Sequence, residues 1–158
     1  MDKLDKVDQK ILSILRKDGR ASHATIAKEV GLSAPAVGER IRKLEQQGTI
    51  QGYQAVLSPE ALGLNIASFV AIIPQPRSPA SELVDKLTQL PEVEELHAVA
   101  GDYSYIMKVR VENTQKLDVF LDRLFMLEGV ERTQATIILK SQFERPLFLP
   151  FEQGGPKT

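Results

Sequence analysis

Side chains able to bind nucleic acid gather in the segment between Ser33 and Gln47. Its apolar residues recur at intervals of three and four, which predicts an amphipathic helix with these side chains inward: Val37, Ile41 and Leu44. A rotation of about 100° per residue places another set on the opposite face: Pro35, Glu39, Arg42 and Gln46, flanked by Gly38 and Lys43. The segment is therefore either a DNA-reading helix or an ordinary surface helix.

The polar residues of this segment have distinct interpretations on DNA. Arg42 and Gln46 are expected to reach base edges, whereas neighbouring basic residues are better placed for phosphates: Lys43, Arg40, Lys28 and Arg20. Arg40 lies nearer to the inward side, so anchoring the domain is an equal alternative for it. Glu39 could accept a hydrogen bond from cytosine, although a surface ion pair is the commoner use of a glutamate.

Three small or rigid residues shape the same helix. Ser33 can cap its N-terminus, and Pro35 is tolerated in the first turn, where backbone N–H groups lack partners inside the helix. Gly38 could permit close approach to the DNA backbone. We therefore count all three among the candidate DNA-binding residues.

Two helices must precede this segment and position it. Asp5 can cap a helix that ends at Gly19, and Ser22 can cap a shorter one that ends at Gly31. A short turn containing glycine lets the second and third helices cross steeply, as in a helix-turn-helix. Short helices joined by glycine also occur in other helical bundles, so the pattern alone does not distinguish a DNA-binding unit from such a bundle.

The charge distribution is uneven along the chain. The net charge of the 158 residues is −1, yet residues 1–52 contain 10 lysines and arginines against 7 aspartates and glutamates. The basic excess therefore lies in the part of the chain that carries the predicted DNA-binding helix. Because phosphate contacts supply much of the affinity for DNA, this excess agrees with DNA binding, although solvated surfaces often show a similar asymmetry.

Composition narrows the class of protein. A hydrophobic content of 42% with 26% charged residues is typical of globular domains. The absence of cysteine excludes disulfides and cysteine-ligated metals. We find no apolar run long enough to cross a bilayer and no signal peptide, so we expect a cytoplasmic protein that does not contact the membrane.

The second half of the sequence repeats one pattern of elements. A strand at 66–73, a helix from Ser78 or Pro79 to Leu90 and a strand at 93–99 are followed by a strand at 105–111, a helix opened by Asn113, and a strand at 130–139. Two βαβ units in tandem predict a ferredoxin-like βαββαβ sandwich with both helices on one face of an antiparallel sheet.

We therefore expect an α+β chain in four parts. These are a three-helix, winged-type helix-turn-helix at 1–50, a linker strand and turn at 51–64, the ferredoxin-like module at 65–144 and a tail at 145–158. The helices leave the other face of the sheet uncovered, and its apolar residues require a cover. We expect the same sheet of a second chain there, because two-fold pairing is the commonest closed arrangement of subunits.

With these elements in place, the chain resembles the leucine-responsive and asparagine-related regulators of the Lrp/AsnC family. The matching runs extend from residue 4 to about 140: "LDKVDQKILSILRKDGR", "IAKEVGLS", "AVGERIRKLEQQGTIQGYQAVLSPEALG", "VAGDYSYIMKVRV" and "GVERTQATIILK". The resemblance implies a transcriptional regulator that binds double-stranded DNA, dimerises through its sheets and often assembles into octamers of four dimers. It also implies a response to an amino acid or a related small effector.

The resemblance further implies an effector site at an interface between dimers. It would be formed by a loop and by the strand opposite: Gly101, Asp102, Tyr103 and Ser104, with Thr133, Gln134 and Thr136. Such a site would suit an amino acid, because the Asp102 carboxylate could accept from its ammonium group and backbone N–H groups beside Gly101 could donate to its carboxylate. The alternative is a plain hairpin loop. Many members have Asp at the position of Ser104 and Thr or Ser at Ala135, so these departures indicate an altered ligand or none.

Two other functions remain open. Sirohaem decarboxylases resemble the same two-domain architecture, and His97 could serve a tetrapyrrole there. An amino-acid-sensing module could also act on a protein partner without DNA. The sequence has only two histidines, His23 and His97, and it lacks metal-binding and nucleophile motifs. We therefore expect no enzyme activity, no metal and no cofactor other than an amino-acid effector.

Overall fold

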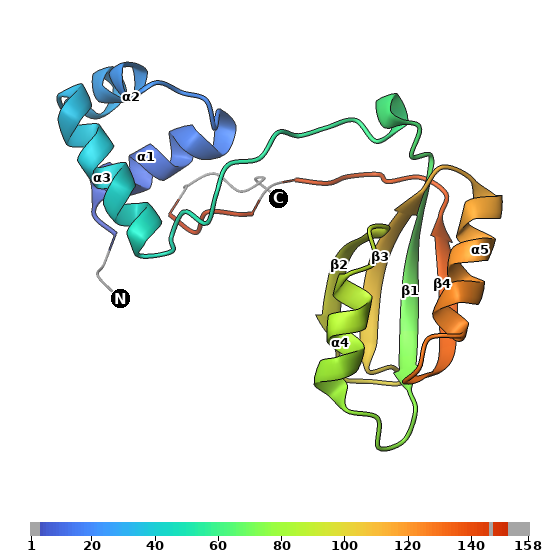
Figure 1. Cartoon of the computed structure of the whole chain (residues 1–158). Helices are drawn as coiled ribbons and strands as arrows, with labels where there is room; N and C mark the ends of the chain where they lie inside the picture. The colour runs from blue at the N-terminus through green and yellow to red at the C-terminus, as the bar shows by residue number, and fades with distance from the viewer. Residues whose placement is uncertain (1–3, 146, 152–158) are drawn as a thin grey trace, which may run out of the picture. The chain divides into compact units, whose positions relative to one another are not determined.

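The computed structural model describes residues 4–145 and 147–151 and divides them between two compact units. The first unit contains the described residues up to 56 and from 144 onwards, and the second contains residues 57–143. The first unit is helical, and the second is a sheet with helices packed on it (Figure 1). Each unit has its own hydrophobic core.

The first unit is built from α1 (Lys6–Lys17), α2 (His23–Val30) and α3 (Ala34–Gln46). The predicted caps are all present: the side chains of Asp5, Ser22 and Ser33 accept hydrogen bonds from backbone N–H groups in the first turns of the three helices. Gly31 ends α2 in the left-handed conformation at φ 71°, which glycine adopts readily. The turn between α2 and α3 is therefore the predicted helix-turn-helix connection.

The core of the first unit lies between the three helices. Val37, Ile41 and Leu44 of α3 are buried, as their spacing predicts, and they pack against Ile11 of α1 and Ile26 of α2. Because the inward side of α3 is fixed by these contacts, its opposite face must point to solvent.

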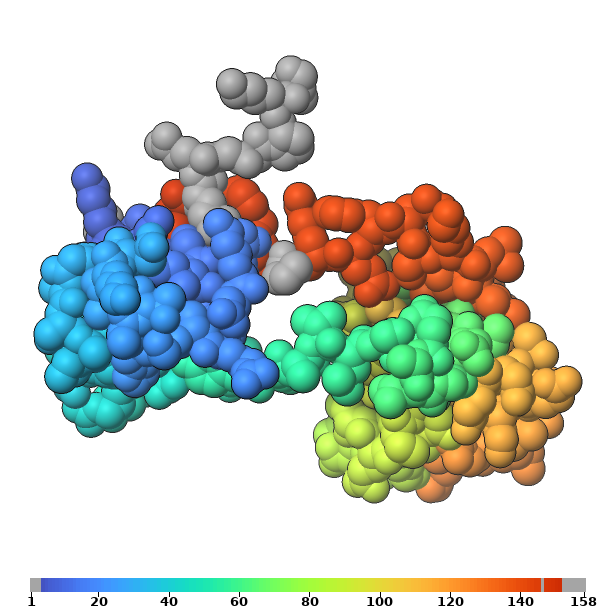
Figure 2. All heavy atoms as spheres, turned by 90° about the horizontal axis from the view of Figure 1, so that it is seen from above, coloured from blue at the N-terminus to red at the C-terminus, as the bar shows by residue number. Residues whose placement is uncertain are grey.

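The linker differs from the prediction. We expected a strand within residues 51–64, but these residues contain only a 3-10 turn, η1 (Glu60–Leu62). A strand requires a neighbour with which to exchange backbone hydrogen bonds, and no described segment of this chain pairs with the linker. Within the described residues, the three helices are thus followed by no β-hairpin wing. Figure 1 shows η1 at the end of the second unit where β1 (Ile66–Pro74) begins, and Figure 2 shows this green segment at the surface of the unit.

The second unit has the predicted ferredoxin-like order of elements. After β1 come α4 (Ala80–Thr88), β2 (Val93–Ala98), β3 (Tyr105–Val111), α5 (Thr114–Phe125) and β4 (Val130–Ile138). The strands pair antiparallel in the order β2-β3-β1-β4. Asn113 caps α5 as predicted, with its side chain accepting from the N–H of Lys116 at 2.9 Å.

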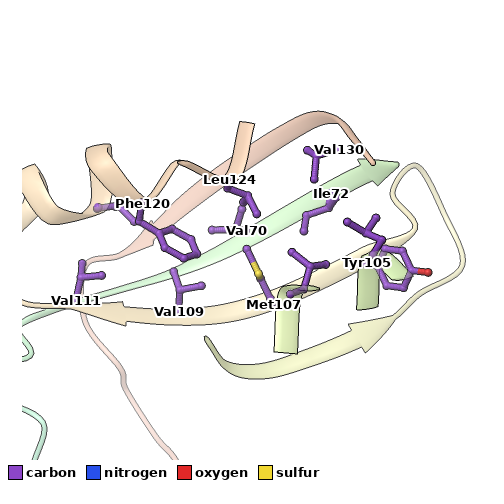
Figure 3. Close-up of a cluster of buried hydrophobic side chains, with 12 residues drawn as sticks. Val70, Ile72, Tyr105, Met107, Val109, Val111, Phe120, Leu124 and Val130 are labelled. Carbon is purple, nitrogen blue, oxygen red and sulfur yellow. The ribbon is translucent and has the colours of Figure 1, made fainter. Parts of the chain in front are cut away.

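Both helices cover the same face of this sheet. Alternate residues of β1 and β3 point toward them, including Val70, Ile72, Met107 and Val109, and Figure 3 shows how these side chains meet Phe120 and Leu124 of α5. This alternation follows from the two-residue period of a strand. The core of the unit is therefore the layer between sheet and helices.

We call the other side of the sheet the open face, because no helix in the described part of the second unit covers it. Strand register places these residues on it: Phe69, Ala71 and Ile73 of β1, Ile106, Lys108 and Arg110 of β3, and Gln134 and Thr136 of β4. Phe69 is 45% exposed, a large value for a phenylalanine at the centre of a sheet. The predicted second chain over this face stays a prediction.

Candidate DNA interface and effector site

The outward face of α3 presents the predicted base-reading residues to solvent. Arg42, Lys43 and Gln46 are exposed, whereas Val37, Ile41 and Leu44 are buried on the opposite side. Pro35 lies in the first turn of the helix, as predicted. One regular helix therefore carries all of these side chains, so their relative positions are set by helical geometry alone.

Arg42 is paired with Glu39, one turn earlier on the same helix. Nε of Arg42 donates to Oε2 of Glu39 at 3.2 Å, and Nη2 donates to Oε1 at 2.5 Å. Hydrogen bonding to Arg42 lowers the pKa of the Glu39 carboxyl, and its Coulombic attraction acts in the same direction. The surface ion pair that we weighed against cytosine binding is therefore formed in the free protein.

Arg40 has a different environment. Its Nη1 donates to Oδ2 of Asp5 at 2.6 Å and to Oδ1 of Asp8 at 2.8 Å, and both aspartates lie at the start of α1. Asp5 and Asp8 also form the capping box of that helix. The pKa of Asp5 is lowered first by its hydrogen bond from the Asp8 N–H and then by Arg40. These contacts favour the anchoring role of Arg40 over phosphate binding.

Gly38 and His23 form a contact that the sequence did not predict. A Cβ atom added to Gly38 would lie 3.1 Å from Nδ1 of His23 and 3.2 Å from its Cε1. The glycine therefore lets the imidazole in the first turn of α2 lie against α3. The glycine thus serves packing between two helices, and its use for close approach to DNA stays a prediction.

The remaining predicted phosphate-binding residues lie at the two ends of α2. Arg20 precedes its N-terminus, where its N–H donates to Oδ1 of Asp18 at 2.9 Å, and Lys28 occupies its last turn. Both side chains are exposed. Together with Lys43 they place positive charge around α3, which suits a polyanion.

The predicted effector loop lies between β2 and β3. Ser104 fixes its end, because the Ser104 N–H donates to the carbonyl of Ile72 at 3.1 Å, and its own carbonyl accepts from Val99 at 3.0 Å. Gly101 has φ 149°, which favours glycine. Asp102 is exposed at the tip. Gly101 therefore supplies turn geometry, as the plain loop alternative requires.

Tyr103 connects this loop to β4. Its hydroxyl donates to Oε1 of Gln134, 31 residues further along the chain. Gln134 and Thr136 are paired with Ala71 and Phe69, so they lie on the open face, whereas Thr133 points to the helix side. The structure thus joins Tyr103 to Gln134 and leaves Thr133 on the other face.

The two histidines of the sequence lie in separate surroundings. His23 and His97 belong to different units, and Nε2 of exposed His97 lies 3.2 Å from Oε2 of Glu95. No group of three histidine, aspartate or glutamate side chains in the described ranges could hold a metal ion. Likewise, no described helix is long and apolar enough to span a bilayer.

Comparison with known families and proteins covers both units. Residues 4–45 match the AsnC-type helix-turn-helix domain, and residues 68–148 match the Lrp/AsnC ligand binding domain. The chain is 41% identical over 137 residues to the HTH-type transcriptional regulator FL11 of Pyrococcus furiosus, which covers 87% of this chain and 90% of that protein. It is 38% identical over 147 residues to the HTH-type transcriptional regulator LrpA of Mycobacterium tuberculosis, covering 93% and 97% respectively.

Solved structures show the same architecture. The feast or famine regulatory protein of M. tuberculosis, complexed with L-methionine, has a TM-score of 0.88 at 38% identity and covers 94% of this chain and all of that one. A transcriptional regulator of Neisseria meningitidis in complex with L-Met has a TM-score of 0.86 at 28% identity, covering 90% and 94%. These relatives are named as regulators, so the decarboxylase alternative gains no support.

Proposed function

Because the chain belongs to the Lrp/AsnC family of transcriptional regulators, we propose that it reads a DNA sequence with α3 and responds to an amino-acid effector. The observation that carries the proposal is the exposed face of α3, where Arg42 and Gln46 lie opposite the buried anchor residues. Arginine can donate two hydrogen bonds to guanine, and glutamine can pair with adenine in the major groove. Lys43, Lys28 and Arg20 supply the phosphate contacts.

A single first unit offers few base-reading side chains, so we propose that affinity comes from assembly. Two chains pairing through the open face would present two copies of α3 to one duplex, at half-sites about one helical turn or a multiple apart. The exposed Phe69 and its neighbours Ala71 and Ile106 provide apolar area for that pairing. Further association of dimers into an octamer would add avidity and bend DNA. Such a regulator acts where the genomic DNA lies, in the cytoplasm.

The proposed effector site is the loop at Gly101–Ser104 together with Gln134 and Thr136. The bond between Tyr103 and Gln134 supports this grouping, because it holds the loop beside β4. Two relatives are complexed with L-methionine, which makes L-amino acids the first probes. Calorimetric titration of the full chain with the twenty L-amino acids tests the site, and heat that disappears on Asp102→Ala would support it.

The DNA-binding proposal is tested by selecting duplexes from a random pool with the full chain. Arg42→Ala should lower the preference for the selected duplex over a scrambled one by about 1 to 3 kcal/mol, without changing the oligomeric state. Lys28→Ala is the matched control, because a lost phosphate contact should weaken both duplexes about equally. An unchanged preference in Arg42→Ala would exclude α3 as the reader. Absence of any mobility shift at low salt would instead favour the alternative function, an amino-acid-sensing module that acts on a protein partner without binding DNA.

A further inference from the structure

The ion pair between Glu39 and Arg42 uses only one edge of the guanidinium. Glu39 accepts from Nε and from Nη2, at 3.2 and 2.5 Å. A guanidinium carries five N–H donors in a rigid planar fork, so Nη1 and the second hydrogen of Nη2 are still available at the far edge. Two parallel N–H groups at that edge match O6 and N7 of guanine. Arg42 can therefore bind Glu39 and a base at the same time.

Nothing else on α3 orders the Arg42 side chain comparably. The side chains of Arg42 and Glu39 are 59% and 52% exposed, so packing restrains them little. An exposed arginine samples many rotamers, and ordering it on binding costs affinity. A bidentate carboxylate one turn away restricts this freedom before DNA arrives.

The other arginine of α3, Arg40, is held in a different way. Arg40 is bound by two carboxylates of another helix through a single nitrogen and is only 33% exposed. Arg42 is held by its own helix on the face that points to solvent. A contact within α3 moves with the helix, so it orients Arg42 relative to the groove rather than relative to the rest of the unit.

We propose that Glu39 is a positioning residue for DNA reading, which holds Arg42 so that its far edge is presented to a guanine. The role rests on the proposed reading of DNA by α3 and deepens it, because it assigns a G·C pair to that position. The negative charge of Glu39 also repels phosphates, so it weakens binding to unrelated sequences. Glu39 thus increases selectivity in two ways, without itself contacting a base.

The test compares four full-length proteins: wild type, Glu39→Gln, Arg42→Ala and the double variant. Each is titrated with the duplex selected by wild type, with versions in which single G·C pairs are replaced by A·T, and with a random-sequence duplex. Glu29→Gln is the matched control, because it removes an exposed glutamate from α2 instead of α3. Thermal unfolding of each variant confirms that the fold is retained.

Glu39→Gln should bind the random duplex more tightly and should discriminate about two- to tenfold less at the G·C pair that Arg42→Ala identifies. In the Arg42→Ala background, the same change should leave discrimination unaltered, and Glu29→Gln alone should retain the discrimination of wild type. Full discrimination by Glu39→Gln would overturn the positioning role alone. An equal loss with and without Arg42 would show that Glu39 reads a base directly. Failure of wild type to enrich any sequence, or full discrimination by Arg42→Ala, would instead overturn DNA reading by α3.

Discussion

The two candidate sites of this protein are built in opposite ways. The candidate DNA-reading residues lie on one helix, α3, whose start is set by the Ser33 cap and whose inward side is set by buried residues. The candidate effector site combines a loop with a distant strand and is joined by one hydrogen bond between Tyr103 and Gln134. Local rules therefore suffice to arrange the first site, whereas the second depends on strand register and loop closure.

This difference also concerns the state in which each site is complete. The candidate DNA-reading side chains of α3, Arg42 and Gln46, are already exposed together within a single chain. The open face, on which Gln134 lies, exposes Phe69 and is expected to change its environment when a second copy binds. The candidate DNA-reading face is thus complete in one chain, whereas the candidate effector site is expected to be completed when further chains bind.

The largest expected effect tests whether DNA binding by α3 depends on pairing of chains through the open face. Phe69→Asp puts a charge on the open face and should convert the assembled protein to monomers, measured by sedimentation velocity. Because the second copy of α3 is then lost, affinity for the selected duplex should fall by about 10² to 10⁴-fold. Val119→Asp is the control, since Val119 is 63% exposed on α5 and should change neither property. Tight binding by a monomeric Phe69→Asp protein would show that α3 acts alone.

A smaller effect tests how the effector site is held together. Tyr103→Phe removes only the hydroxyl that donates to Gln134. A neutral hydrogen bond contributes about 1 kcal/mol, so the affinity for the amino acid that binds best should fall roughly fivefold by calorimetry. Tyr53→Phe, which removes the hydroxyl bonded to Glu45 in the first unit, should leave that affinity unchanged. Equal affinities for wild type and Tyr103→Phe would mean that the loop needs no such connection.

The smallest effect concerns the internal packing of the DNA-binding unit. Alanine is favoured over glycine inside a helix by about 1 kcal/mol, but a Cβ at position 38 would press on His23. Gly38→Ala should therefore stabilise the His23→Ala variant by about 0.5 to 1 kcal/mol in urea unfolding, and stabilise wild type less. The double variant should keep its affinity for DNA. Weakened DNA binding with unimpaired stability would restore the interpretation that Gly38 serves close approach to DNA.

Elements with strong local signals were predictable from the sequence. Capping residues and hydrophobic periods located the three helices of the first unit, and the repeated βαβ pattern predicted the antiparallel sheet with both helices on one face. The inward residues of α3 followed from the helical period of 3.6 residues. These features depend on neighbours in sequence, so no knowledge of the tertiary structure was needed.

Contacts between distant residues were not predictable in the same way. The partners of Arg40 are separated from it by 35 and 32 residues, and the sequence therefore left anchoring and phosphate binding equal. The contact between His23 and Gly38 depends on how steeply α2 and α3 cross. The linker strand was predicted from composition, but a strand forms only where another backbone supplies partners. Each of these features is determined by how separate elements pack together, not by the sequence of any single element.

Pairing through the open face would also make DNA binding depend on the concentration of the protein in the cell. Where two chains must meet before both copies of α3 reach DNA, the concentration of paired protein rises with the square of the monomer concentration when monomers predominate. Promoter occupancy would then respond steeply to small changes in synthesis or degradation of the chain. A single exposed phenylalanine in the middle of β1, Phe69, would in this way make cellular abundance itself a regulatory signal.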